Sequence, residues 1–296
     1  MMKEEGAEVP AVVQSLLDKG YESFYKEVDN ELYFFDGTEY QAVPVNEKVI
    51  DLKRYKKKHG VIKKNTGASL IDLGDGIALL EFHSQSNAIG LDIMQMINFA
   101  VDEVEKNYKG LVIGNQGRNF CVGANLGLIL MEAQDDNIFE LDFVIRTFQN
   151  AMMKIKYSSK PVVAAPFAMT LGGGAEVCIP AAHIQASSET YMGLVEAGVG
   201  LIPGGGGNVG LYTKHLKGLP NDVHTDYQFI ANKVFETIAM AKVSTSGEEA
   251  RENNFLNFAD GVSVNADHLI YDAKKAALAL YENGYKAPKR EKIPVT

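Results

Sequence analysis

The stretch "KPVVAAPFAMTLGGGAEVCIPAAHIQAS", residues 160–187, contains the pattern that decides the fold. A β-prone apolar run follows Lys160 and Pro161, three adjacent glycines come next, and the strand-like "IQAS" closes the stretch. Glu176 is its only acidic residue and lies two positions after the glycines, among apolar neighbours. A short buried strand, a glycine turn, a helical segment and another strand are typical of an α/β fold.

The alternation of strand and helix continues on the N-terminal side of this stretch. Residues 68–82 hold two β-prone runs around a Gly-Asp-Gly turn, which predicts a hairpin. Residues 91–107 carry apolar side chains at helical spacing, and "KGLVIGN" at 109–115 is a brief buried strand. Another helix is predicted over residues 139–155. The sequence therefore predicts an α/β core with short, mostly buried strands over residues 65–210.

Two flanking segments differ from this core. Residues 1–64 predict one short helix and a hairpin turning at Asp36-Gly37, too little to bury a core alone. They end in "KRYKKKHGVIKK", residues 53–64, where seven of twelve positions are Lys or Arg. A solvated linker and a contact for ligand phosphates both fit such a run of like charges. Residues 211–296 are predicted to be mainly helical.

Composition limits the class of protein. The chain has 296 residues, of which 46% are apolar and 23% charged, as in soluble globular proteins. Its net charge of −9 opposes a broad binding surface for nucleic acid or anionic membrane. The opening residues lack the apolar region of a secretion signal, and no apolar stretch is long enough to span a bilayer. We expect a cytoplasmic protein with two reduced cysteines.

Two glycine-containing segments, residues 114–126 and 169–177, each follow a predicted buried strand. Ligands bind at the carboxyl ends of strands in open α/β sheets, and glycine lets a backbone N–H approach a ligand closely. Two such N–H groups directed at one oxygen would form an oxyanion hole, although a pair of tight turns without a ligand fits the glycines equally. Glu176 and Glu196 are the acids near these segments, and two carboxyl groups in one dry pocket could divide the acid and base roles.

Other chemistry has weaker support in the sequence. Cys121 lies beside the first glycines, but no histidine partner for a nucleophile is indicated. The six histidines show no paired metal-ligand spacing, so no metal is expected. No Gly-x-Gly-x-x-Gly follows a strand with an acid about twenty residues later, so we expect neither a dinucleotide site nor dehydrogenase activity in this chain.

Three segments together resemble the enoyl-CoA hydratase/isomerase (crotonase) superfamily: "NFCVGANL" (119–126), the stretch 160–187, and "GLVEAGVGLIPGGGGN" (193–208). The resemblance implies a ββα spiral core with a small N-terminal appendage and a helical C-terminal region. Asn125 departs from the Asp of many relatives, and Asn208-Val209 replaces their common Thr-Gln-Arg. These departures leave acyl-chain preference and subunit contacts open.

The resemblance also implies a site. The N–H groups of Val122 and Gly173 would bind the thioester oxygen, Glu176 would activate water for attack at C3 of a trans-2-enoyl-CoA, and Glu196 would protonate C2. Further contacts to the substrate would come from Asn87, Ala88, Cys121, Gly123, Ala124, Asn125, Leu126 and Gly172. Keeping both glutamates favours hydration over isomerisation. Coenzyme A would enter as part of the substrate, with no tightly bound cofactor, and a trimer-based homo-oligomer is expected.

The outer segments resemble parts of longer fatty-acid oxidation enzymes. "EVPAVVQSLLDKGYESFYK" is similar to the last part of a 3-hydroxyacyl-CoA dehydrogenase, and "FETIAMAKVSTSGEEAREN" to the tail of bifunctional oxidation proteins. The resemblance therefore implies the C-terminal part of a dehydrogenase/hydratase polypeptide, acting in fatty-acid β-oxidation. Two alternatives remain: a Δ3,Δ2-enoyl-CoA isomerase, and a non-catalytic acyl-CoA-binding or assembly module that lacks its dehydrogenase half.

Overall fold

A computed structural model describes residues 8–29, 31–217, 219 and 225–294. The chain divides into two compact units, which are described separately. The first consists of Met1–Glu47 and Lys53–His59, and the second of Lys48–Leu52 and Gly60–Thr296.

The first unit contains a helix and an antiparallel sheet. Its elements are α1 (Ala11–Asp18), β1 (Tyr25–Val28), β2 (Glu31–Phe35) and β3 (Tyr40–Ala42), with the strands in the order β1-β2-β3. The predicted turn at Asp36 is present, because its carboxylate accepts hydrogen bonds from the N–H groups of Thr38 and Glu39. The basic run interpreted as a linker is helical over much of its length, as α2 (Leu52–His59).

The second unit is built on a seven-stranded sheet in the part of the chain that the structure describes. Its strands, in the order β12-β10-β8-β7-β6-β5-β4, are β12 (Gly261–Ser263), β10 (His183–Ser187), β8 (Val162–Ala164), β7 (Gly110–Ile113), β6 (Ile77–Phe82), β5 (Ala68–Asp72) and β4 (Lys63–Lys64). The strands from β12 to β6 run parallel, and β5 and β4 are antiparallel to their neighbours. A separate parallel pair joins β9 (Ala168–Leu171) to β11 (Thr190–Gly193).

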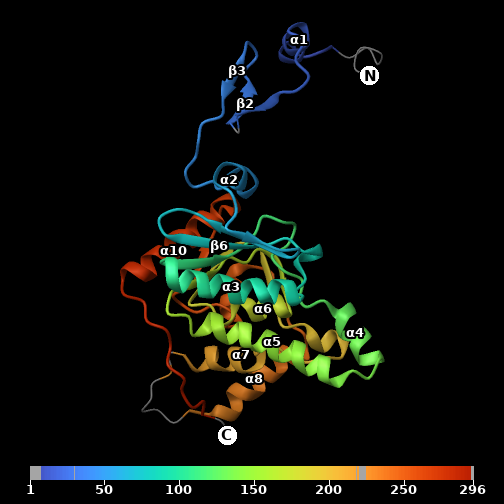
Figure 1. The fold of residues 1–296 in the computed structure, drawn as a ribbon, viewed down its shortest axis with the longest axis vertical. Coiled ribbons are helices and arrows are strands. Elements are labelled where there is room, and N and C mark those ends of the chain that lie inside the picture. Colours follow the sequence, from blue (N-terminus) through green and yellow to red (C-terminus); the bar gives the residue numbers. More distant parts are fainter. Residues whose placement is uncertain (1–7, 30, 218, 220–224, 295–296) are drawn as a thin grey trace. The chain divides into compact units, whose positions relative to one another are not determined.

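Helices connect and cover these strands (Figure 1). They are α3 (Leu91–Asn107), α4 (Leu126–Gln134), α5 (Ile138–Lys156), α6 (Gly173–Cys178), α7 (Gly207–Leu216), α8 (Tyr227–Ala239), α9 (Gly247–Glu252) and α10 (Leu269–Glu282), with short 3-10 helices at Gln85–Asn87, Glu196–Val199 and Ala266–His268. The predicted α/β architecture and helical C-terminal region are therefore confirmed. Strand β12 was not predicted, and it brings this region into the main sheet.

Both faces of the main sheet are covered. Leu80, Leu111 and Ile113 belong to the core cluster that includes the apolar side of α3. Their strand neighbours Leu79 and Val112 are equally buried, and alternation along a strand directs them to the opposite face. Helix α10 packs against β7, β8 and β10. A sheet covered on both faces explains why its central strands β7 and β8 are continuously apolar rather than alternating.

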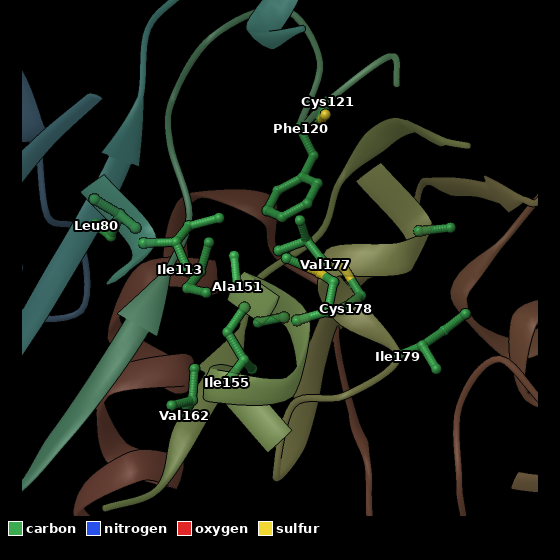
Figure 2. Packing of buried hydrophobic residues seen from close by; sticks show 14 of the residues in the cluster. Leu80, Ile113, Phe120, Cys121, Ala151, Ile155, Val162, Val177, Cys178 and Ile179 are labelled. Atoms are coloured by element: carbon green, nitrogen blue, oxygen red, sulfur yellow. The ribbon is translucent and has the colours of Figure 1, made fainter. Parts of the chain in front are cut away.

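The core extends to the segments that follow the strands. Figure 2 shows Phe120 and Cys121, which lie beyond β7, in the same apolar cluster as Val177 and Cys178 of α6. Phe120 is fully buried, so its ring holds the following residues against the body of the unit. Among the described residues no helix combines the length and apolar character needed to cross a membrane.

Candidate active site

The two glycine-containing segments meet in the second unit. The Cys121 N–H donates to the Met169 carbonyl at 3.1 Å, and the Leu171 N–H donates to the Cys121 carbonyl at 3.0 Å. A Cβ placed on Gly123 would lie 3.9 Å from the Gly173 nitrogen. The segment that contains Val122 and the segment that contains Gly173, here called the two predicted oxyanion segments, therefore run side by side. Their hydrogen bonds join Cys121 to strand β9.

The N–H groups of Val122 and Gly173 are free to bind an added acceptor. Within the described chain neither group donates a hydrogen bond to a protein atom. Gly173 is the first residue of α6, where backbone N–H groups have no partner inside the helix. Two unpaired N–H groups on adjacent segments are the donors that an oxyanion hole requires.

The run of three glycines has a steric cause at two positions. Gly172 has a φ of 53°, which side chains rarely tolerate, and its N–H donates to the Gly193 carbonyl at 2.8 Å. A Cβ on Gly174 would lie 2.5 Å from the Cys121 carbonyl oxygen. A side chain at Gly174 would therefore force the two segments apart, and a side chain at Gly172 would be strained by the backbone conformation.

Glu176 lies in the first turn of α6, as predicted, and is buried. Its Oε1 accepts hydrogen bonds from the N–H groups of Gly205 at 2.8 Å and Gly207 at 2.7 Å. Burial raises the pKa of this carboxyl to about 7, these hydrogen bonds oppose the rise, and the charge of Glu196 adds to it. The glycine loop thus fixes the carboxylate, and a Cβ on Gly207 would lie 2.9 Å from Oε1.

Glu196 opens the 3-10 helix that follows β11. Its Oε1 would lie 3.4 Å from a Cβ on Gly172, so the carboxylate borders the predicted oxyanion segment. Both carboxylate oxygens are buried and lack a hydrogen-bond partner among the described residues. Burial raises the pKa of this carboxyl. Buried polar atoms in native proteins are nearly always paired, so an unpaired carboxylate suggests a functional role.

The two acids lie near the same segment. Glu196 lies beside Gly172, Glu176 extends from the helix that begins at the next residue, and the charge of Glu196 contributes to the raised pKa of Glu176. The two carboxyl groups therefore interact electrostatically. The arrangement has one acid fixed by backbone donors and one without a partner.

The remaining predicted contact residues lie along the same segment. The Gly123 carbonyl accepts from the Ile89 N–H, and Ala124 forms a parallel bridge with Ile89 next to Ala88. Asn125 precedes α4, and Leu126 is its first, exposed residue. The Cys121 side chain is buried in the core (Figure 2), and burial raises the pKa of its thiol to about 12, which makes it a poor nucleophile.

Two features beside the predicted site were missed by sequence reasoning. The loop of Gly205 and Gly207 was recognised only as part of a pattern, although its glycines are the donors to Glu176. Asn115 was not singled out, yet it is buried beside the oxyanion segment. The side chain of Asn87, which was predicted to contact substrate, donates to the Asn115 Oδ1 and to the Asn119 carbonyl. Polar residues flanking a glycine segment were the available signal.

Comparisons with known proteins agree with this geometry. A family model described as enoyl-CoA hydratase/isomerase matches residues 72–216. The chain is 61% identical over 294 residues to a protein of Bacillus subtilis (strain 168) named probable 3-hydroxyacyl-CoA dehydrogenase, covering 99% of this chain and 37% of that protein. It is 25% identical over 252 residues to the fatty acid oxidation complex subunit alpha of Shewanella frigidimarina (strain NCIMB 400), covering 72% of this chain and 33% of that protein.

The fold also matches solved structures. A crystal structure of an enoyl-CoA hydratase from Polaromonas sp. JS666 superposes with a TM-score of 0.60 at 21% identity, covering 72% of this chain and 77% of that chain. At that identity the likeness concerns the fold. The chain spans well under half the length of the two curated relatives.

Proposed function

Because the chain belongs to the enoyl-CoA hydratase/isomerase (crotonase) superfamily, we propose that it adds water to 2-trans-enoyl-CoA thioesters. The observation that carries this proposal is Glu196, whose buried oxygens have no partner and lie beside the oxyanion segment. A second acid, Glu176, is fixed nearby by the glycine loop. Hydration needs one group to take a proton from water and another to deliver a proton to carbon, and this pair supplies both.

The oxyanion donors would stabilise the charge that develops during addition. When water attacks C3, the electrons of the double bond move toward the thioester carbonyl, whose oxygen becomes enolate-like. The N–H groups of Val122 and Gly173 bind that oxygen more strongly as its charge grows, so they lower the barrier rather than only the ground state. A single donor of this kind contributes roughly 10²- to 10³-fold in rate.

The two carboxyl groups would handle the protons. Glu176, ionised and oriented by Gly205 and Gly207, takes a proton from the attacking water as its oxygen bonds to C3. Glu196, whose burial favours the neutral form, donates a proton to C2. The pair holds one proton before and after the reaction, and exchange with solvent returns it to Glu196 before the next turnover.

The direct test is hydration of crotonyl-CoA, followed as loss of absorbance of the conjugated thioester. We expect turnover that saturates with substrate and forms 3-hydroxybutyryl-CoA. Conversion of a 3-enoyl-CoA to the 2-trans isomer without hydration would favour an isomerase instead. Calorimetric binding of an acyl-CoA without any turnover would support a non-catalytic module, and either result contradicts the proposed hydratase.

The rate should depend on pH through Glu176. Its carboxyl must be ionised to act as a base, and its pKa is raised to about 7, so activity is lost as the pH falls through that value. We expect kcat/KM to decrease about tenfold per pH unit as the pH falls below about 7. The profile is measured with crotonyl-CoA in buffers of constant ionic strength. A rate that stays constant down to about pH 5 would exclude Glu176 as the base.

We further propose that this activity belongs to fatty-acid oxidation. The product of hydration is a 3-hydroxyacyl-CoA, the class of compound in the name of the Bacillus subtilis relative, and the Shewanella relative is named for fatty acid oxidation. A dehydrogenase that oxidises the new hydroxyl group would consume the product. Reduction of NAD⁺ when a 3-hydroxyacyl-CoA dehydrogenase is added to this chain and crotonyl-CoA, and not with this chain alone, is the corresponding measurement.

A further inference from the structure

A group of asparagine side chains supports the segment that ends at Val122. The Asn87 Nδ2 donates to the Asn115 Oδ1 at 3.1 Å and to the Asn119 carbonyl at 2.9 Å. The Asn115 Nδ2 donates to the Phe120 carbonyl at 3.0 Å, and its Oδ1 also accepts from the Gly117 N–H at 2.9 Å. We call Asn87, Asn115 and Asn119 the asparagine clamp. Its hydrogen bonds hold four of the seven residues before Val122, namely Asn115, Gly117, Asn119 and Phe120.

The clamp also reaches the second oxyanion segment. The Asn119 Oδ1 accepts from the Met169 N–H at 3.3 Å, in the strand that leads to Gly172 and Gly173. The backbone hydrogen bonds between Cys121 and β9 set the register of the two segments. The clamp adds side-chain bonds just before that register begins, where the chain must turn from the end of β7 toward Val122.

The clamp lies beside an open pocket. The pocket, of about 320 Å³, is lined by Asn115, Gln116, Phe167 and residues at and just before the start of α10, including Ile270. Hydrogen bonds to buried amides are directional, so the clamp can fix the position of the loop on the side that borders this pocket.

Burial of the clamp's amide side chains and its backbone conformation both cost free energy, which argues against an incidental role. Asn87 and Asn115 are 7% and 3% exposed, and buried amides destabilise the fold unless they are hydrogen-bonded. Asn87 and the preceding Ser86 both have positive φ, 53° and 55°. Consecutive residues in this region store strain that the surrounding contacts must offset, as is common near functional sites.

We propose that Asn87 and Asn115 are positioning residues that direct the Val122 N–H toward the thioester oxygen. The inference rests on the proposed function, in which that N–H is an oxyanion donor. The two side chains act through the backbone of Asn119 and Phe120 and do not contact the reacting atoms. Loss of the clamp should therefore weaken stabilisation of the developing charge while leaving binding of the rest of the acyl-CoA intact.

The test combines kinetics with a spectroscopic probe of the carbonyl. Cinnamoyl-CoA absorbs at longer wavelength when hydrogen bonds polarise its thioester oxygen, whether or not turnover follows. Asn87→Gly removes the side chain and tolerates the positive φ. We expect its kcat for crotonyl-CoA to fall about 10- to 100-fold, because a misdirected oxyanion donor loses part of its contribution to the rate. KM should change less than about threefold. The red shift of bound cinnamoyl-CoA should decrease in parallel.

Two further variants keep the result interpretable. Ser84→Ala is the control, because Ser84 bonds the Ala88 carbonyl in the same loop but has no bond to residues 115–121. Its kcat and red shift should equal those of the wild type. Asn119→Ala removes only the half-buried link to Met169, and is used if Asn87→Gly fails to fold. It should also reduce the red shift.

Two results would overturn the inference. One is a folded clamp variant with the wild-type red shift and the wild-type kcat. The other is a variant that loses both stability and kcat while bound cinnamoyl-CoA keeps the wild-type red shift. Failure of the proposed function looks different. In that case the wild type itself does not hydrate crotonyl-CoA, whereas the red shift of bound cinnamoyl-CoA in the wild type and its loss in Asn87→Gly still test the clamp.

Discussion

Glu176→Gln is expected to lower kcat for crotonyl-CoA hydration about 10³-fold while making the protein more stable above neutral pH. The amide cannot take a proton from water, and a general base contributes roughly 10²- to 10⁴-fold. Its oxygen still accepts from Gly205 and Gly207, so the glycine loop keeps its place. The variant also removes a charge whose burial is unfavourable.

The stability change has a definite pH dependence. A carboxyl pKa raised from 4.5 to about 7 favours the neutral form by up to about 3 kcal/mol, so this contribution is complete at low pH and is lost as the pH rises through 7. The free energy of unfolding in urea should therefore be similar for wild type and variant near pH 5. Near pH 8 the variant should be more stable, by at most that amount.

The control for this substitution is Glu282→Gln, the same chemical change at an exposed position at the end of α10. It should leave kcat unchanged, and its unfolding over the same pH range is measured for comparison. Retention of more than about a tenth of wild-type kcat by Glu176→Gln would contradict its assignment as the base. A variant that is less stable than the wild type near pH 8 would contradict the cost of its burial.

Glu196→Gln is expected to lower kcat by about 10²- to 10³-fold, since a glutamine cannot donate a proton to C2. The residual rate is measured at high enzyme concentration with crotonyl-CoA. Retention of more than about a tenth of wild-type kcat would contradict the assignment of Glu196 as the proton donor.

The stability of this variant gives an independent check. The oxygens of Glu196 accept no hydrogen bond within the described residues, so the amide sacrifices no existing contact. Unfolding in urea should therefore show no loss of stability. A variant that is less stable than the wild type would mean that the carboxylate has a contact which the amide loses.

Much of the fold followed from local patterns. The hairpin of β5 and β6, helices α3 and α5 and strand β7 were all predicted, because each has a strong apolar periodicity and a recognisable turn or end. The glycines before α6 predicted a turn at a strand end, where Gly172 has its positive φ. These features depend on residues only a few positions apart.

Elements that depend on distant partners were missed. Strand β12 has three residues and becomes a strand only by pairing with β10, more than seventy positions earlier. The basic run at 53–64 was interpreted from its charge alone, although most of it forms α2. The buried ion pair between Lys214 and Asp260, with 3.6 Å between Nζ and Oδ2, could not be predicted from the sequence. The two residues are far apart in the chain, and only the fold brings their charges together.

The sequence by itself determined the α/β class, the family, the order of the glycine segments and the identity of the two acids near them. Only the tertiary structure decided that Glu176 is held by Gly205 and Gly207, that Glu196 has no partner, and that Asn87 supports the loop before Val122. The physical reason is the distance along the chain over which each interaction acts. Turn geometry and periodicity arise within a few residues, whereas burial, hydrogen-bond pairing and the resulting pKa are set by whichever distant groups the fold brings within a few ångströms.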